Sequence, residues 1–311
     1  MTTLPVILMA VDGSEPCMDA INYISRILSP NQITIELFHV RAEAPEAMFD
    51  LGDDDGPTSY EAEITKWNDL KGNEIQTFMD KARNVFTHAG FPPDAVNTTI
   101  RSRKTGIARD IINESKQGYS LVVIGRKGLG TLPEFMMGSI AAKLAESMAH
   151  VPLVVVGGQP ETTKVLVAFD RSRSIRKGID SVSRLFSRSL EEILLCHIIR
   201  PLSVPHPVTC TYFSTKTEAH WLDEHSRQII PAMVDVKKHL SSIGFDPNTF
   251  RTAILKKKIS RADAIVREAD AHEFGTLVVG RHGASSVKEF TMGRVTRKVL
   301  SMAYNKAVWI I

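Results

Sequence analysis

Two short apolar runs that each end in an aspartate decide the fold of this chain. The first is Val6-Ile-Leu-Met-Ala-Val-Asp12-Gly-Ser14, and the second, Val165-Leu-Val-Ala-Phe-Asp170-Arg-Ser172, places its aspartate 158 residues later. Another piece, Ser120-Leu-Val-Val-Ile-Gly125-Arg-Lys-Gly128, returns after 155 residues as Gly275-Thr-Leu-Val-Val-Gly280-Arg-His-Gly283. Between them, Leu37-Phe-His39-Val40 corresponds to Leu195-Cys-His197-Ile198. Because the order and spacing agree, we read the chain as a tandem duplication with a unit of roughly 155 residues.

Each copy alternates short apolar runs with amphipathic segments. In the first copy the apolar runs cover about residues 5–11, 33–40, 97–101, 120–125 and 151–156. Runs of this kind are typical of parallel strands that are buried on both faces. We therefore predict an α/β protein with two domains, residues 1–159 and 160–311, each an open parallel five-stranded sheet flanked by helices. The joint Gly157-Gly158-Gln159-Pro160 is short, so the domains are expected to lie close together.

The composition is that of an ordinary globular protein. The chain has 311 residues, of which 43% are hydrophobic and 23% charged. No apolar run reaches the roughly 18 residues of a membrane span, so we expect no membrane partner. The apolar start that ends at Asp12 has the pattern of a buried strand and not of a signal peptide. Three cysteines without a CxxC pair indicate a reducing compartment, and we place the protein in the cytoplasm.

The two halves differ in charge. Residues 1–159 contain 14 Lys and Arg against 20 Asp and Glu, whereas residues 160–311 contain 24 against 15. A basic half is common in proteins that bind nucleic acid, but no aromatic residues are interleaved with these basic clusters, so we expect no nucleic-acid partner. The alternative is that opposite charges help the halves to dock.

The residues with chemical potential follow the predicted strands. In an open parallel sheet, ligands bind at the carboxyl ends of the strands, where this chain has Asp12, Val40 and a loop that begins at Gly125. The loop reads Gly125-Arg-Lys-Gly128, then nine residues, then Gly138-Ser139 at the start of an amphipathic helix over 139–149. Glycines let the backbone approach a phosphate, and the free amides and dipole at a helix start attract anions. Each glycine alone could simply end a strand or cap a helix, but their recurrence in the second copy favours a binding site.

The spacing G-x-x-G-(nine residues)-G-[S/T], together with Val11-Asp12-Gly13-Ser14 after the first strand, resembles the universal stress protein family over nearly the whole chain. The resemblance implies a Rossmann-like sheet of strand order 3-2-1-4-5 in each domain, with the last strand used for domain or subunit pairing. It also implies bound ATP, with adenine near Asp12 and Val40, and with the ribose and phosphates along Gly125, Gly128, Gly138 and Ser139. Ala141 departs from the pattern, because many ATP-binding members have a second hydroxyl there.

The second copy departs further from the family pattern. Its matching positions are Asp170, Gly280, Gly283 and Gly293, but Arg294 occupies the Ser/Thr position and Thr296 brings a hydroxyl two residues later. Arg294 would either pair with a phosphate or fill the pocket in its place. The copies also differ in their long excursions, since residues 44–62 are acidic and expected to be mobile or to cap the site, whereas residues 201–220 are rich in Pro and Thr.

Other chemistry is not indicated, and we predict no catalytic residues and no metal site. Neither loop has the lysine of a P-loop, and Gly128-Leu-Gly130 lacks the third glycine of a dinucleotide fingerprint. His220 and His225 are five apart, which is a poor spacing for zinc on a helix, and Asp53-Asp54-Asp55 lacks the spacing of a calcium loop. The strand-end residues His39 and His197 are read as packing residues.

We therefore expect an ATP-binding stress-response or signalling protein in which the nucleotide changes conformation or partner binding. Two alternatives stay open. One is a nucleotide-free scaffold that pairs through strands 151–156 and 307–311, either between its own domains or in a homodimer. The other is a slow ATPase in which Asp12 holds Mg²⁺ near the phosphates.

Overall fold

The computed structural model describes residues 4–42, 58–130, 133, 135–202, 213–283 and 291–311. The first copy contains β1 (Val6–Ala10), α1 (Glu15–Ile27), β2 (Thr34–Arg41), α2 (Thr58–His88), β3 (Val96–Ser102), α3 (Ile107–Ser115), β4 (Leu121–Gly125), α4 (Ser139–Ser147) and β5 (Leu153–Val156). The second contains β6 (Lys164–Ala168), α5 (Arg173–Ser183), β7 (Glu192–Ile198), α6 (Thr215–Ser242), β8 (Phe250–Leu255), α7 (Arg261–Ala271), β9 (Thr276–Val279), α8 (Arg294–Met302) and β10 (Ala307–Ile310). The five strands predicted for the first copy are all present. Of the acidic excursion 44–62, only residues 58–62, at the start of α2, fall within the described backbone.

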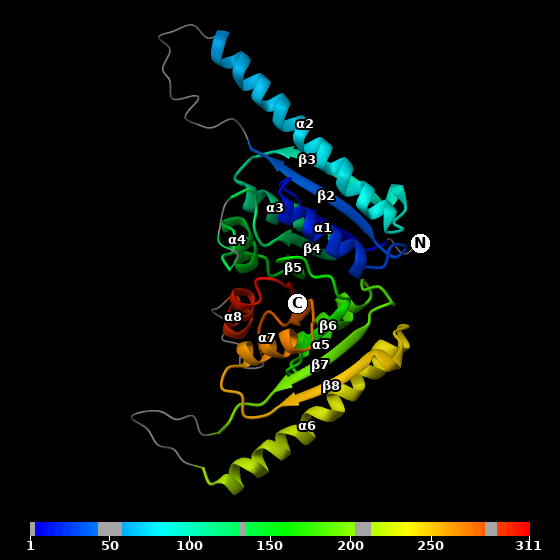
Figure 1. The fold of residues 1–311 in the computed structure, drawn as a ribbon, viewed down its shortest axis with the longest axis vertical. Helices are drawn as coiled ribbons and strands as arrows, with labels where there is room; N and C mark the ends of the chain where they lie inside the picture. Colours follow the sequence, from blue (N-terminus) through cyan, green and yellow to red (C-terminus); the bar gives the residue numbers. More distant parts are fainter. Residues whose placement is uncertain (1–3, 43–57, 131–132, 134, 203–212, 284–290) are drawn as a thin grey trace, which may run out of the picture.

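The strands form one sheet of ten and not two separate sheets of five. Its order is β3-β2-β1-β4-β5-β10-β9-β6-β7-β8, so each half has the order 3-2-1-4-5 that the family resemblance implies. The halves join where β5 pairs antiparallel with β10, with Leu153 opposite Ile310 and Val156 opposite Ala307 (Figure 1). The prediction of two sheets was wrong because each half would end in an exposed apolar edge, and pairing the two edges satisfies both.

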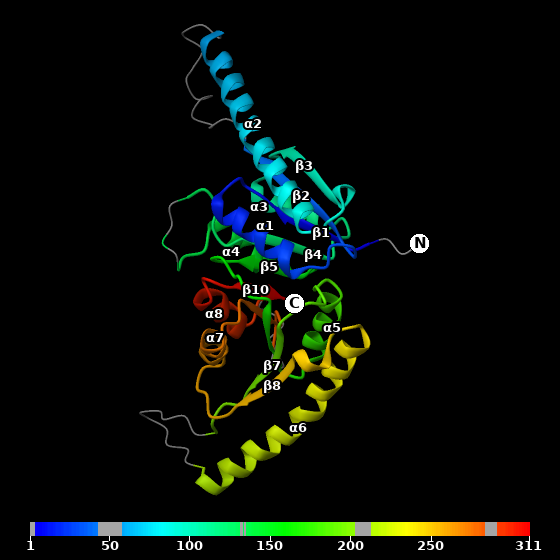
Figure 2. The same cartoon turned by 45° about the vertical axis from the view of Figure 1, so that its right-hand side comes forward.

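Because β5 and β10 pair with each other, this edge is not available to a second chain. The remaining edges of the sheet are β3 and β8, at its two far ends (Figures 1 and 2).

Helices cover both faces of the sheet, and each hydrophobic layer runs through both copies. One buried cluster includes Ile24 of α1, Met79 of α2, Ile179 of α5 and Met233 of α6. The other, on the opposite face, includes residues of α3, α4, α7 and α8. The two copies therefore share their cores across the β5–β10 junction. None of the helices among the described residues combines the length and hydropathy that a membrane crossing requires.

A buried polar contact crosses the junction. The Trp309 indole Nε1 donates to the Tyr23 hydroxyl over 2.7 Å, and that hydroxyl also lies 2.8 Å from Thr276 Oγ1. Trp309 and Thr276 are fully buried and Tyr23 is almost so. Thus α1 of the first copy is tied to β9 and β10 of the second. By contrast, the ion pairs between described residues each lie within one copy, so the unequal charges of the halves form no direct bridge between them.

The joint between the copies is as short as its sequence predicts. Gly157 donates its N–H to the Lys306 carbonyl over 3.1 Å. A Cβ atom at Gly157 would overlap with the backbone carbonyl of Tyr304. Only glycine therefore fits where the first copy ends against the second.

Candidate functional site

The predicted site residues of the first copy meet where the strand order reverses. Strands β1 and β4 are parallel neighbours, with Ala10 opposite Ile124. Their carboxyl ends therefore bring Asp12 next to the loop that leaves β4 at Gly125. The chain runs from β1 to β2 on one side of this point and from β4 to β5 on the other, and this is the position where doubly wound sheets bind their ligands.

Asp12 is held in place by the turn that starts α1. One carboxylate oxygen, Oδ1, accepts from the Ser14 N–H over 3.0 Å and from the Ser14 hydroxyl over 2.6 Å. Ser14 in turn caps α1, since its Oγ accepts from the Cys17 N–H over 3.3 Å. The other oxygen, Oδ2, faces Gly128, where a Cβ atom would overlap with it. The Gly128 backbone thus approaches Asp12 as closely as a glycine permits.

The glycine loop is folded back onto the start of α4. The Gly138 N–H donates to the Arg126 carbonyl over 2.9 Å, which closes the loop. Gly138 is the N-cap of α4, with φ −62° and ψ 150°, and has no side chain to satisfy the first amides of the helix. Ser139 is exposed beside these amides. This end of α4 therefore carries the positive end of the helix dipole and donors that no side-chain cap engages.

Val40 and His39 stand near the carboxyl end of β2, the strand that pairs with β1. Val40, near the end of β2, is buried and belongs to the hydrophobic layer on the α4 face of the sheet. His39 Nδ1 donates to the Val11 carbonyl over 2.7 Å, and burial lowers the pKa of the imidazole, partly offset by this hydrogen bond and by Asp12. His197 makes the same contact with Phe169 over 2.6 Å, and burial lowers its pKa in the same way. Each histidine ties the ends of two adjacent strands together, which fits the prediction of a packing role.

The second copy repeats the backbone of this site. Gly293 caps α8 with φ −66° and ψ 151°, and its N–H donates to the Arg281 carbonyl over 2.9 Å. Asp170 Oδ1 accepts from the Ser172 N–H over 2.9 Å, as Asp12 does from Ser14. Arg171 stands where the first copy has Gly13 and keeps the left-handed turn, with φ 63°. The turn survives without its glycine at a steric cost of about 1–2 kcal/mol.

The side chains at the second site differ from those at the first. A Cβ at Gly283 would lie 3.4 Å from Asp170 Oδ2, an ordinary contact, so this loop is less tightly closed than the loop at Gly128. Gly280 directly follows β9, whereas Gly125 is the last residue of β4, and the exposed Arg294 is the first residue of α8. Thr296 does not supply a free hydroxyl as the sequence suggested, because it is buried and donates to the Gly280 carbonyl over 2.6 Å. Ala141 occupies the equivalent position in the first copy and is buried, so the first copy has no such hydrogen bond between the strand end and the helix. A hydroxyl at this position would not be an exposed donor for a phosphate.

Sequence reasoning gave no role to two arginines in these loops. Arg126 and Arg281 follow the first glycine of each loop, and both are buried. The signal was present in the repeat, since both copies read Gly-Arg-x-Gly. Each arginine has a partner in the opposite copy, however, and the local motif does not reveal that partner.

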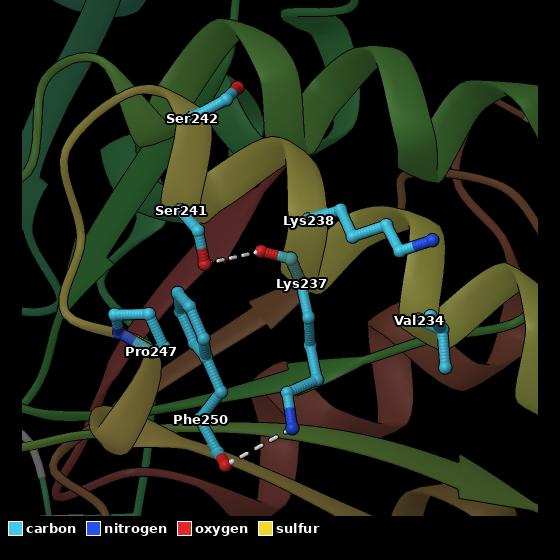
Figure 3. A pocket seen from close by; sticks show the side chains of 7 residues that line it. All are labelled: Val234, Lys237, Lys238, Ser241, Ser242, Pro247 and Phe250. Carbon is cyan, nitrogen blue, oxygen red and sulfur yellow. Dashed lines mark hydrogen bonds between the residues drawn. The ribbon is translucent and has the colours of Figure 1, made fainter.

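A separate pocket of about 600 Å³ lies between α6 and β8 (Figure 3). Lys237 reaches across it to the Phe250 carbonyl at 3.4 Å, and Ser241 donates to the Lys237 carbonyl at 3.0 Å. Phe250 is the first residue of β8, so this pocket lies at the amino end of that strand, away from the glycine loops. Within the described part of the chain, no group of three or more His, Cys, Asp or Glu is placed to hold a metal ion.

Comparison with known proteins identifies the family. A sequence model of the universal stress protein family matches residues 4–157 and again residues 161–305. The chain belongs to the universal stress protein family. Universal stress protein Slr1230 of Synechocystis sp. is 23% identical over 303 residues, which are 94% of this chain and 95% of that protein. Universal stress protein YxiE of Bacillus subtilis is 25% identical over 151 residues, 48% of this chain and 96% of YxiE.

A solved structure gives the same fold. The crystal structure of a universal stress protein from Archaeoglobus fulgidus covers 98% of this chain, and 97% of its own length is matched, with a TM-score of 0.58 and 14% identity. The present universal stress protein therefore shares its architecture with a known structure over nearly its full length.

Proposed function

We propose that this universal stress protein binds ATP at the start of α4 in its first copy, and that the bound nucleotide changes its conformation or partner surface in a stress response. The observation that carries the proposal is the α4 turn, where uncapped amides and the exposed Ser139 lie beside a glycine loop closed onto Asp12. An anion is the natural partner of such a helix start. The position of the turn, at the reversal of strand order, is where doubly wound folds hold nucleotides.

The donors of this turn are sufficient for useful affinity. A hydrogen bond to a charged group contributes about 1.5–3 kcal/mol, and the helix dipole adds about 0.3–1 kcal/mol. Three such donors together approach the 8 kcal/mol or so that corresponds to a micromolar Kd. Val40 supplies apolar surface for the base, and Asp12 Oδ2 is the carboxylate oxygen not held by Ser14.

We assign tight binding to the first copy only. At the second site Arg294 replaces the serine, and the Thr296 hydroxyl is committed to the Gly280 carbonyl. Of the two roles expected for Arg294, the proposal takes the one in which its side chain occupies the anion position in place of a ligand. The proposal therefore gives one tightly bound nucleotide per chain.

Isothermal titration of the purified chain with ATP tests the proposal. We expect a Kd on the order of micromolar and about one site per chain. A Cβ at Gly138 would meet the Arg126 carbonyl and the Lys127 Cα at 3.4 and 3.6 Å, so the fold tolerates a side chain there, but the methyl groups of Gly138→Val would occupy the anion position. Gly138→Val should abolish binding without lowering the melting temperature by more than a few degrees.

The matched control is Gly293→Val, which makes the same change at the equivalent cap of the second copy. A Cβ there would lie 3.2 Å from the Arg281 carbonyl, so the change disturbs the second loop and should weaken the tight site far less than Gly138→Val does. Absence of binding at millimolar ATP, or loss of the tight site in Gly293→Val and not in Gly138→Val, would contradict the proposal.

A further inference from the structure

Two buried arginines lie at the junction between the copies without a carboxylate partner. Arg126 and Arg281 are 3% and 7% exposed, and neither takes part in an ion pair with a described residue. Burial lowers the pKa of both guanidinium groups. Each donates to one carbonyl of its own copy, Arg126 to Phe135 over 3.1 Å and Arg281 to Thr291 over 3.4 Å. A buried charge is costly unless it is compensated. The role of these arginines therefore depends on the other carbonyls to which they donate.

Those partners are the ends of two helices in the opposite copy. Arg126 Nη1 donates to the carbonyl of Leu300, in the last turn of α8, over 2.6 Å. Arg281 donates to the carbonyls of Ala145, at 2.9 Å, and of Met148, which is the C-cap of α4. The carboxyl end of a helix carries the negative end of its dipole, which a buried cation complements. Each copy thus caps the nine-residue helix that starts at the glycine loop of the other, and α4 and α8 lie side by side in both views (Figures 1 and 2).

The backbone of the same two residues holds the start of the helix in their own copy. The Arg126 carbonyl accepts from the Gly138 N–H, and the Arg281 carbonyl accepts from the Gly293 N–H, both over 2.9 Å. Together with the side-chain contacts, these bonds form a closed circuit. It runs from the start of α4 along that helix to Arg281, then to the start of α8, along α8 to Arg126, and back to Gly138.

We propose that this reciprocal arginine pair couples the two glycine loops, so that Arg281 is a positioning residue for the anion site of the first copy and Arg126 for that of the second. The proposal rests on the proposed function, because it concerns the same nucleotide site. A helix of nine residues is only about 13.5 Å long and moves as a rigid rod, so a cation that fixes its last turn also fixes the amides of its first. An anion at the amino end of α4 and a guanidinium at its carboxyl end both complement the helix dipole, so the guanidinium favours binding of the anion. The coupling is reciprocal, as linkage requires.

The test substitutes the arginine remote from the first site. Arg281→Gln removes the cation from the end of α4 and should weaken ATP binding at the first copy about 3- to 10-fold. Arg281→Lys keeps the charge without the planar fork and should restore part of the loss. Amide hydrogen exchange of Ala142, whose N–H donates to the Gly138 carbonyl over 2.9 Å, is measured in the same variants without nucleotide, where Arg281→Gln should speed exchange relative to wild type.

The matched control is Arg188→Gln. Arg188 also donates to backbone carbonyls, those of Ser183 at 2.9 Å and Phe186 at 3.4 Å, and neither carbonyl belongs to α4 or α8. Its loss should lower stability without changing ATP affinity or exchange in the first turn of α4.

The outcomes separate the coupling from nucleotide binding itself. If wild type binds ATP and Arg281→Gln binds it equally well, the coupling is refuted while the proposed function stands. If wild type binds no ATP, the proposed function fails, and the exchange measurement alone decides the coupling. Faster exchange in Arg281→Gln but not in Arg188→Gln supports it, and equal exchange in both overturns it. Should Arg281→Gln not fold, Arg281→Lys carries the same comparison.

Discussion

The contact between Gly128 and Asp12 can be tested by adding a single methyl group. In Gly128→Ala the new Cβ would fall well inside the 3.0 Å limit below which neighbouring atoms must shift, and the atom in its way is Asp12 Oδ2. The carboxylate cannot simply rotate, because its Oδ1 is held by the Ser14 N–H and hydroxyl at 3.0 and 2.6 Å. Each of these bonds to a charged group contributes about 1.5–3 kcal/mol. Partial loss of both predicts a destabilisation of about 1–3 kcal/mol and at least a tenfold loss of ATP affinity, measured by urea unfolding and by titration calorimetry.

Two alanine substitutions serve as controls for this prediction. At Gly130, two residues along the same loop, a Cβ would meet nothing within 4 Å, so Gly130→Ala should match wild type. Gly283→Ala makes the equivalent change in the second copy, where the distance to Asp170 Oδ2 is 3.4 Å and no shift is required. If Gly128→Ala is as stable as Gly130→Ala and binds ATP equally well, the Gly128 backbone does not lie as close to the Asp12 carboxylate as described.

Two further predictions concern the junction and the histidines. Tyr23→Phe removes the hydroxyl that accepts from the Trp309 indole and contacts Thr276, leaving buried polar groups unpaired, and should cost about 1–3 kcal/mol in urea unfolding. Burial lowers the folded-state pKa of His39 and His197, so below pH about 6.5 the unfolded chain binds protons that the folded chain does not, and stability should fall with pH by at most about 1.4 kcal/mol per unit for each histidine. This loss should stop once pH passes below the folded pKa, and the variant with both histidines changed to Asn should show a flatter stability profile between pH 5 and about 7.

Each of these predictions has a direct control or refutation. Tyr304 is 40% exposed, so Tyr304→Phe should leave stability within about 0.5 kcal/mol of wild type, and equal effects at Tyr23 and Tyr304 would contradict the buried network. A pH profile that does not change when both histidines are replaced would show that other groups cause the acid sensitivity.

Much of this architecture could be predicted because short sequence patterns specify the strands and loops, and the same patterns occur in both copies. The apolar runs predict the strands, and the repeated aspartate and glycine positions predict that Asp12 lies beside the loop at Gly125. The single ten-stranded sheet was missed because the partner of β5 is β10, and no local pattern states whether two apolar edges pair within one chain. The hydrogen bond from the Thr296 hydroxyl to the Gly280 carbonyl could not be predicted, because spacing along a helix does not show which way a side chain turns.

The two arginines show the limit of a motif most clearly. Arg126 and Arg281 stand in the best-repeated segment of the chain, yet Leu300 is 174 residues from the first, and Ala145 is 136 residues from the second. A repeat indicates that a residue matters in both copies. It does not indicate that each residue acts on the other copy.

Amide hydrogen exchange of the first turn of α4, measured with and without ATP, tests the central claim most directly, because the account assigns the phosphates to those amides. We predict that ATP slows exchange at Ser139, Ile140 and Ala141, with a much smaller effect at the start of α8. Unchanged exchange in this turn at saturating ATP, or protection only around Lys237 and Phe250 in the pocket between α6 and β8, would contradict the account.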